Sequence, residues 1–219
     1  MATAASVLPL HWTAADFHEH LGHIPLQRIR LNPPPGLATL TDVLTVQAQE
    51  DRLCELIDGV LVEKTVGYYA SRIALLIGHF LEDFLGQHDL GIVLGADGML
   101  QLQQEQVRIP DVSFISWAHF PDRELPSEPI PRLVPDLAVE VLSTSNTWQE
   151  MNRKLQEYFA AGTQLVWYVA PETQRITVYT APAQGVELGV EDSLDGGDVL
   201  PGFHLPIREL FDRAGRRRR

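Results

Sequence analysis

The chain has 219 residues, of which 45% are hydrophobic and 21% charged, a balance typical of a globular domain with a substantial core. No apolar run approaches the roughly 20 residues that cross a bilayer, and the first ten residues lack the basic region of a signal peptide. Cys54 is the only cysteine, which excludes an intrachain disulfide and a multi-cysteine zinc site. We therefore expect a cytoplasmic protein with no membrane segment.

The charge balance argues against binding of nucleic acid by the overall field of the protein. Twenty-nine acidic and 17 basic residues give a net charge of −12, which repels phosphates. The last four residues are arginines, and we interpret them as a solvated tail. Any attraction of phosphates would need a local basic cleft, for which the candidates are Arg72, Arg108, Arg153 and the Arg tail.

The first 40 residues are predicted to form an arm. Thr13 and Asp16 have the spacing of a capping box, which opens a short helix that ends at Gly22. The Asn-Pro-Pro-Pro-Gly run at residues 32–36 predicts a stiff connector. A second short helix is expected to begin after Thr41. We divide the chain into this arm (1–40), a main domain (41–212) and a basic tail (213–219).

Strand and helix patterns alternate in the main domain. Residues 53–57 and 60–63 flank an Asp-Gly pair and predict a β-hairpin. Apolar residues at helical spacing predict a helix over 68–85, ended by Gly86. A second helix is predicted to have its N-cap among residues 143–146 and to end at Gly162. Further strands are predicted at 92–94, 99–102, 112–115, 137–142, 165–169 and 175–179. This order predicts a mixed α/β sheet flanked by helices.

Glu140 stands in the middle of the apolar strand pattern at 137–142. A carboxylate buried there without a partner costs several kcal/mol, so a partner is expected. Asp136 is four residues away on the same strand, about 13 Å at ~3.3 Å per residue, too far to share a cation. Asp111, at the start of another strand, would lie beside Glu140 if the two strands are neighbours, because strands are about 4.8 Å apart. Asp111 and Glu140 are therefore the candidate metal ligands.

Lys154 is the candidate ammonium group of the same site. It is one of only two lysines, Lys64 being the other, in a chain that has fifteen arginines. Its helix has an apolar stripe of Trp148, Met151, Leu155 and Tyr158, which places Lys154 at the edge of the side that faces the sheet. The alternative is an ordinary i,i+4 surface pair with Glu150.

Two carboxylates on adjacent strands with an ammonium group suit metal-assisted phosphodiester hydrolysis. The cation polarises the phosphate and lowers the pKa of a bound water, and the lysine orients that water or stabilises the developing charge. No G-x-S-x-G elbow, G-x-x-x-x-G-K loop or H-E-x-x-H pair occurs in the sequence. The residues alone are thus compatible with a metal-dependent hydrolase.

The chain from Leu53 to Phe211 also resembles the Uma2-type restriction endonucleases, a domain family within the PD-(D/E)XK nuclease superfamily. The matching stretches are Cys-Glu-Leu-Ile-Asp-Gly (54–59), Arg-Ile-Pro-Asp-Val (108–112), PDLAVEVLSTSN (135–146), KLQEYFAAG (154–162) and Val-Leu-Pro-Gly-Phe (199–203). The resemblance implies a restriction-endonuclease-like fold, a Mg²⁺ (or Mn²⁺) cofactor, DNA as substrate and a homodimer.

The resemblance also assigns roles to residues of this chain. Asp111 corresponds to the aspartate of the PD motif and Glu140 to the second acid. The superfamily lysine lies two residues after that acid, where this chain has Leu142, and in this family it is expected from the next helix, which suits Lys154. Glu55 corresponds to an early glutamate that either approaches the metal or pairs locally. Alanine at position 170 departs from the aspartate usual in the family.

Two hypotheses follow for the function. The first is a Mg²⁺-dependent DNA endonuclease in which Asp111 and Glu140 bind the metal, Lys154 is the catalytic ammonium and Glu55 is an auxiliary acid. The second is an inactive module that keeps the nuclease fold for binding a partner, which the net charge of −12 favours. A binding module, however, has no need of Glu140 inside an apolar strand.

Overall fold

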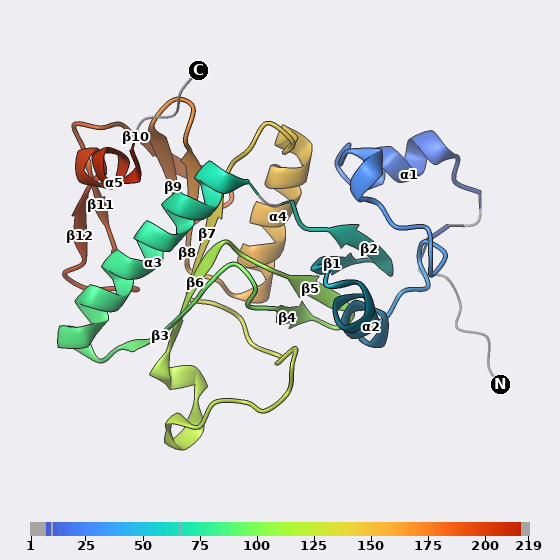
Figure 1. Ribbon diagram of the computed structural model, residues 1–219, viewed down its shortest axis with the longest axis horizontal. Helices are drawn as coiled ribbons and strands as arrows, with labels where there is room; N and C mark the ends of the chain where they lie inside the picture. Colours follow the sequence, from blue (N-terminus) through green and yellow to red (C-terminus); the bar gives the residue numbers. More distant parts are fainter. Residues whose placement is uncertain (1–7, 10, 66, 216–219) are drawn as a thin grey trace.

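A six-stranded mixed sheet forms the centre of the protein, whose computed structural model describes residues 8–9, 11–65 and 67–215 (Figure 1). The strand order is β10-β9-β8-β7-β6-β3. In chain order the strands are β3 (Gly91–Leu94), β6 (Val112–Ser116), β7 (Leu137–Val141), β8 (Leu165–Ala170), β9 (Arg175–Ala181) and β10 (Gln184–Leu188). β7 and β8 are parallel and the other neighbours antiparallel, which confirms the predicted mixed α/β sheet.

Helices cover both faces of this sheet and therefore bury β7 along its whole length. The α-helices are α1 (Ala14–His20), α2 (Leu40–Glu50), α3 (Tyr68–His88), α4 (Trp148–Ala161) and α5 (Ile207–Ala214). Met151 and Leu155 of α4 pack with Ala138 on one face, while α3 and α5 pack with Val139 on the other. Because side chains alternate along a strand, Glu140 lies on the face that α4 covers.

A second sheet lies on the α4 side. Its order is β2-β1-β5-β4, from β1 (Cys54–Ile57), β2 (Val60–Glu63), β4 (Leu100–Gln103) and β5 (Gln106–Arg108). β1 and β2 are the predicted hairpin, and positive φ angles at both Asp58 and Gly59 give the tight turn expected of this pair. Leu100 and Leu102 pack in the same cluster as α4. A short pair, β11 (Ser193–Asp195) with β12 (His204–Pro206), completes the strands of the described chain.

The arm packs on the second sheet. Thr13 and Asp16 form the predicted capping box of α1. Leu21 and Ile24 are buried together with residues of the β1–β2 hairpin. The division of the chain at residues 40 and 212 stays a prediction, and the four C-terminal arginines lie outside the described residues.

Three predicted helix boundaries were wrong. The N-cap of α4 is Thr147 rather than one of residues 143–146. α2 begins at Leu40 rather than after Thr41, because Thr39 forms a capping box with Asp42. α3 continues past Gly86 to His88. The last turn is held by His88, whose ring bonds to the Phe84 carbonyl and stacks on the Phe84 ring. Gly162, in contrast, ends α4 as predicted, with φ of +116°. Within the described residues, no helix combines the length and apolar character that membrane crossing requires.

Candidate active site

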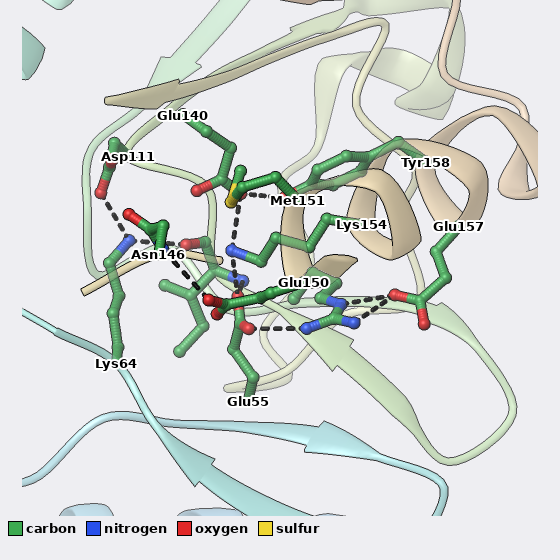
Figure 2. Close-up of polar contacts among 12 residues, drawn as sticks. Glu55, Lys64, Asp111, Glu140, Asn146, Glu150, Met151, Lys154, Glu157 and Tyr158 are labelled. Carbon is green, nitrogen blue, oxygen red and sulfur yellow. Dashed lines mark hydrogen bonds and ion pairs between the residues drawn. The ribbon is translucent and has the colours of Figure 1, made fainter. Parts of the chain in front are cut away.

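Asp111 and Glu140 face each other across two adjacent strands. β6 pairs with β7 in the register Val112↔Val139, so one step further places Asp111 opposite Glu140. The Asp111 N–H donates to the Val139 carbonyl at 3.0 Å, and the Val141 N–H donates to Asp111 Oδ2 at 2.7 Å. Directly opposite side chains lie on the same face, with Cβ atoms about 5 Å apart. This confirms the prediction that the two carboxylates lie side by side on adjacent strands (Figure 2).

Lys154 reaches this carboxylate pair from α4. Its Nζ atom lies 2.8 Å from Glu140 Oε1 and 3.0 Å from Glu55 Oε1, and only 5% of the residue is exposed. The hydroxyl of Tyr158, one turn further along α4, donates to the same Glu140 oxygen at 2.7 Å. Glu150 instead pairs with Arg28 of the arm at 2.8 Å. Lys154 is therefore an interior residue of the site, and the alternative of a surface pair with Glu150 was wrong.

Glu55 joins the second sheet to the site. Its Oε1 atom accepts from the Ile109 N–H at 3.2 Å besides contacting Lys154, and its Oε2 atom pairs with Arg108 at 2.7 Å. Arg108 also pairs with Glu157 of α4. Glu55 thus lies beside the ammonium of Lys154 and holds it from the side opposite Glu140, as Figure 2 shows.

Lys64 is a site residue that the motif analysis did not place. It follows β2, and its Nζ atom lies 2.9 Å from Asp111 Oδ1 and donates to the Ile109 carbonyl at 2.6 Å. Each candidate metal ligand therefore has one lysine beside it. The chain has only these two lysines, and this scarcity was the one signal that could have identified Lys64. Arg108 was identified only as a surface candidate, and Tyr158 only as a core residue.

The charged groups of this cluster shift one another's pKa values. Burial raises the pKa of Glu140 and outweighs the opposing charge of Lys154. Burial would also raise the pKa of Glu55, but Lys154 and Arg108 together lower it. For Lys154, burial favours the neutral amine, yet Glu140 and Glu55 prevail and raise its pKa. Lys154 is therefore an ammonium throughout the neutral pH range.

A cleft of about 810 Å³ opens in front of the carboxylates. Its lining residues come from the end of β7 and the polar loop 143–146, from the start of α3, and from the region of Pro171 and Gly215. Asp111, Glu140, Lys154, Glu55 and Lys64 all contribute to this lining. All four predicted site residues thus meet at one cleft.

Asp136 stays outside this site, as expected. Its carboxylate accepts from the Ser116 N–H at 2.7 Å and from the Gln164 amide at 3.0 Å, and lies near His119. It therefore fastens the loop before β7 to the neighbouring segments.

Among the described residues, Arg72, Arg108 and Arg153 do not form the predicted basic cleft, and the Arg tail lies outside these residues. Arg108 is 1% exposed and bound to Glu55 and Glu157. Arg153 pairs with Asp58 and Glu157, while Arg72 bonds to the Arg213 carbonyl. Arg108 and Arg153 are thus held by carboxylates, and Arg72 by a backbone carbonyl.

The donor set of the cleft fits Mg²⁺. This ion is usually bound by one or two carboxylates together with waters and substrate phosphates, and Asp111 and Glu140 supply two carboxylates on one face. Both protein donors to Glu140 reach Oε1, so Oε2 has no hydrogen bond from the described residues. No cluster of three or more His, Cys, Asp or Glu able to hold a metal occurs in the described part of the chain.

Fold and site together define a protein of the restriction-endonuclease-like fold. The sequence profile of the Uma2 family, described as "Putative restriction endonuclease", matches residues 40–208, and the chain therefore belongs to this family. A solved structure with a similar fold is that of "a putative nuclease belonging to DUF820 from Anabaena variabilis", with a TM-score of 0.66 and 18% identity over 75% of this chain and 92% of that chain. Comparison with curated proteins gives no match. The predicted family and fold are confirmed.

Proposed function

We propose that this protein is a Mg²⁺-dependent DNA endonuclease that hydrolyses phosphodiester bonds. The observation that carries the proposal is the pair Asp111 and Glu140, opposite each other at a cleft, with the ammonium of Lys154 at 2.8 Å from Glu140. The description of the Uma2 family and the nuclease with the same fold support the same reaction class.

In this proposal Asp111 and Glu140 bind the cation, which supplies charge stabilisation at the scissile phosphate and a more acidic bound water. Lys154 orients the attacking water or stabilises the negative charge that develops on the phosphate oxygens. Glu55 acts through Lys154: it contacts the ammonium at 3.0 Å and fixes its position. Glu55 is accordingly a positioning residue.

The position of Glu140 favours the enzyme over a pure binding module. The residue is 6% exposed in a strand with apolar neighbours on both sides. A buried ion pair is often no more stabilising than apolar residues of similar volume, so stability alone gives no reason to keep Glu140 and Lys154. A cation site in front of Glu140 does give such a reason.

The test measures Mg²⁺ or Mn²⁺ binding by calorimetry and plasmid nicking on the same samples of wild type, Glu140→Gln and Asp136→Asn. We expect the wild type to bind the cation and nick the plasmid, and Glu140→Gln to lose both. Asp136→Asn, a change in the other Pro-Asp step, should keep both with some loss of stability. Nicking without a cation, or an unchanged Glu140→Gln, would contradict the proposal; cation-independent DNA binding without nicking would favour the binding module.

The proposal also includes the location and the oligomeric state of the enzyme. We infer from the composition and the single cysteine that the enzyme is cytoplasmic. We infer from the family resemblance that it is a homodimer. A dimer would present two clefts to one duplex, which suits cleavage of both strands. Sedimentation equilibrium of the full chain tests this, and a monomer at micromolar concentration would contradict it.

A further inference from the structure

The positive charges that line the cleft are all paired with carboxylates. Among the described lining residues they are Arg28, Lys64 and Lys154. Arg28 pairs with Glu150, Lys64 with Asp111, and Lys154 with Glu140 and Glu55. A phosphodiester that enters this cleft therefore meets no positive side chain of the described lining that is not already paired.

Binding of a cation to Asp111 and Glu140 changes these three pairs differently. Glu150 is outside the proposed metal site, so Arg28 keeps its partner. Lys154 has a second carboxylate, Glu55, at 3.0 Å, so it stays in place. Among the described residues, Lys64 forms an ion pair with Asp111 alone, at 2.9 Å from its Nζ atom. Of the three cations, Lys64 is therefore the one whose ion-pair partner is taken when a cation binds Asp111.

We propose that Lys64 is a second working ammonium of this centre, which competes with the divalent cation for Asp111 and contacts the substrate phosphate once displaced. This inference rests on the proposed function. Asp111 Oδ2 already accepts from the Val141 N–H, which leaves Oδ1, the oxygen that Lys64 contacts, as the less engaged oxygen for a cation. The Ile109 carbonyl, 2.6 Å from Nζ, keeps the displaced ammonium at the edge of the cleft.

The first test uses Lys64→Met, which removes the charge and keeps the length of the side chain. Without its competitor the cation should bind more tightly, by about fivefold or more in calorimetry, the low end of ordinary coupling between linked sites. Binding of a short DNA duplex in the presence of Ca²⁺ should weaken instead, because a phosphate contact is lost. A residue with a purely structural role is not expected to raise the cation affinity and lower the DNA affinity when it is replaced.

Arg52→Met is the matched control. Arg52 precedes the hairpin and pairs with Glu63, so this variant also removes one positive charge near the site without a contact to Asp111. We expect its cation affinity to equal that of the wild type. Equal effects of Arg52→Met and Lys64→Met would assign the change to the general field and overturn the inference.

The second test measures the reactivity of the lysines themselves. Because the chain has two lysines, mass spectrometry after brief acetylation distinguishes Lys64 from Lys154. Addition of Mg²⁺ should increase the acetylation of Lys64 and leave that of Lys154 unchanged. If the wild type binds the cation but Lys64→Met binds it equally or less well, this inference fails and the proposed function stands. If the wild type binds no cation, both fail.

Discussion

The two lysines illustrate how the number of carboxylate partners decides the role of a single residue. Lys154 is enclosed between Glu55 and Glu140 on α4, whereas Lys64 contacts Asp111 at the edge of the cleft. Ammonium groups suit both places, because the compact charge on a flexible stem can be positioned where a planar guanidinium cannot. The same residue type therefore serves as a fixed and as a displaceable charge in one site.

Lys154→Met should cost far more stability than Lys64→Met. The first substitution leaves two buried carboxylates near each other without a counter-charge, and breaking a buried pair in this way costs about 3–5 kcal/mol. The second affects one carboxylate, Asp111, which is still bonded to the Val141 N–H, so we expect a smaller loss of about 1–3 kcal/mol. Urea denaturation of both variants in EDTA measures the difference. Equal losses would mean that the burial of Glu55 and Glu140 carries no electrostatic cost.

At the scale of elements, local patterns predicted most of the fold. The hairpin with its Asp-Gly turn, the apolar stripe of α3 and the end of α4 at Gly162 follow from turn chemistry and helical periodicity, which act within a few residues. Long-range pairs could not be predicted in this way. Two examples are the ion pairs of Arg108 with Glu157 and of Lys64 with Asp111. They depend on how the two sheets pack around α4, which no local sequence pattern predicts.

The arm is fastened to α4, the helix that carries Lys154, although it precedes the region that matches the family. Gly22 approaches the Glu150 backbone so closely that an added Cβ atom would lie 2.7 Å from its nitrogen. Arg28 of the arm pairs with Glu150, and Arg153 donates to the His20 carbonyl at 2.6 Å. These contacts all fall within the first two turns of α4, so the arm fixes the end of the helix next to the cleft.

Arg28→Met should therefore destabilise the protein more than Arg30→Met, a second arm arginine on the same segment. Glu150 is 2% exposed and would lose the one ion pair that it forms with described residues, a change that costs about 3–5 kcal/mol. Arg30 pairs with the more exposed Glu50 and Glu63, and exposed pairs contribute about 1 kcal/mol or less. Thermal and urea denaturation compare the two. A smaller loss in Arg28→Met would show that the arm is not held to α4 by this pair.

At the scale of the whole molecule, the question is what attracts phosphates to this protein. Its net charge is −12, and both lysines of the cleft are paired with carboxylates. Arg108 and Arg153 are engaged with Glu157 and other acidic residues. The sequence could locate the acidic excess but not this pairing. Under the proposed function, the divalent cation would be the main positive charge that the described lining of the cleft offers to the substrate.

DNA binding should consequently depend on the divalent cation. In EDTA at physiological salt we expect weak binding of a short duplex, because few phosphates are neutralised. Ca²⁺, which also prefers oxygen ligands, should increase the affinity tenfold or more in a fluorescence anisotropy titration at constant ionic strength. Glu140→Gln should lose this increase while keeping the weak binding seen in EDTA. If the wild type binds equally well in EDTA and in Ca²⁺, a basic surface outside the cleft attracts the DNA, and the cation then serves the reaction alone.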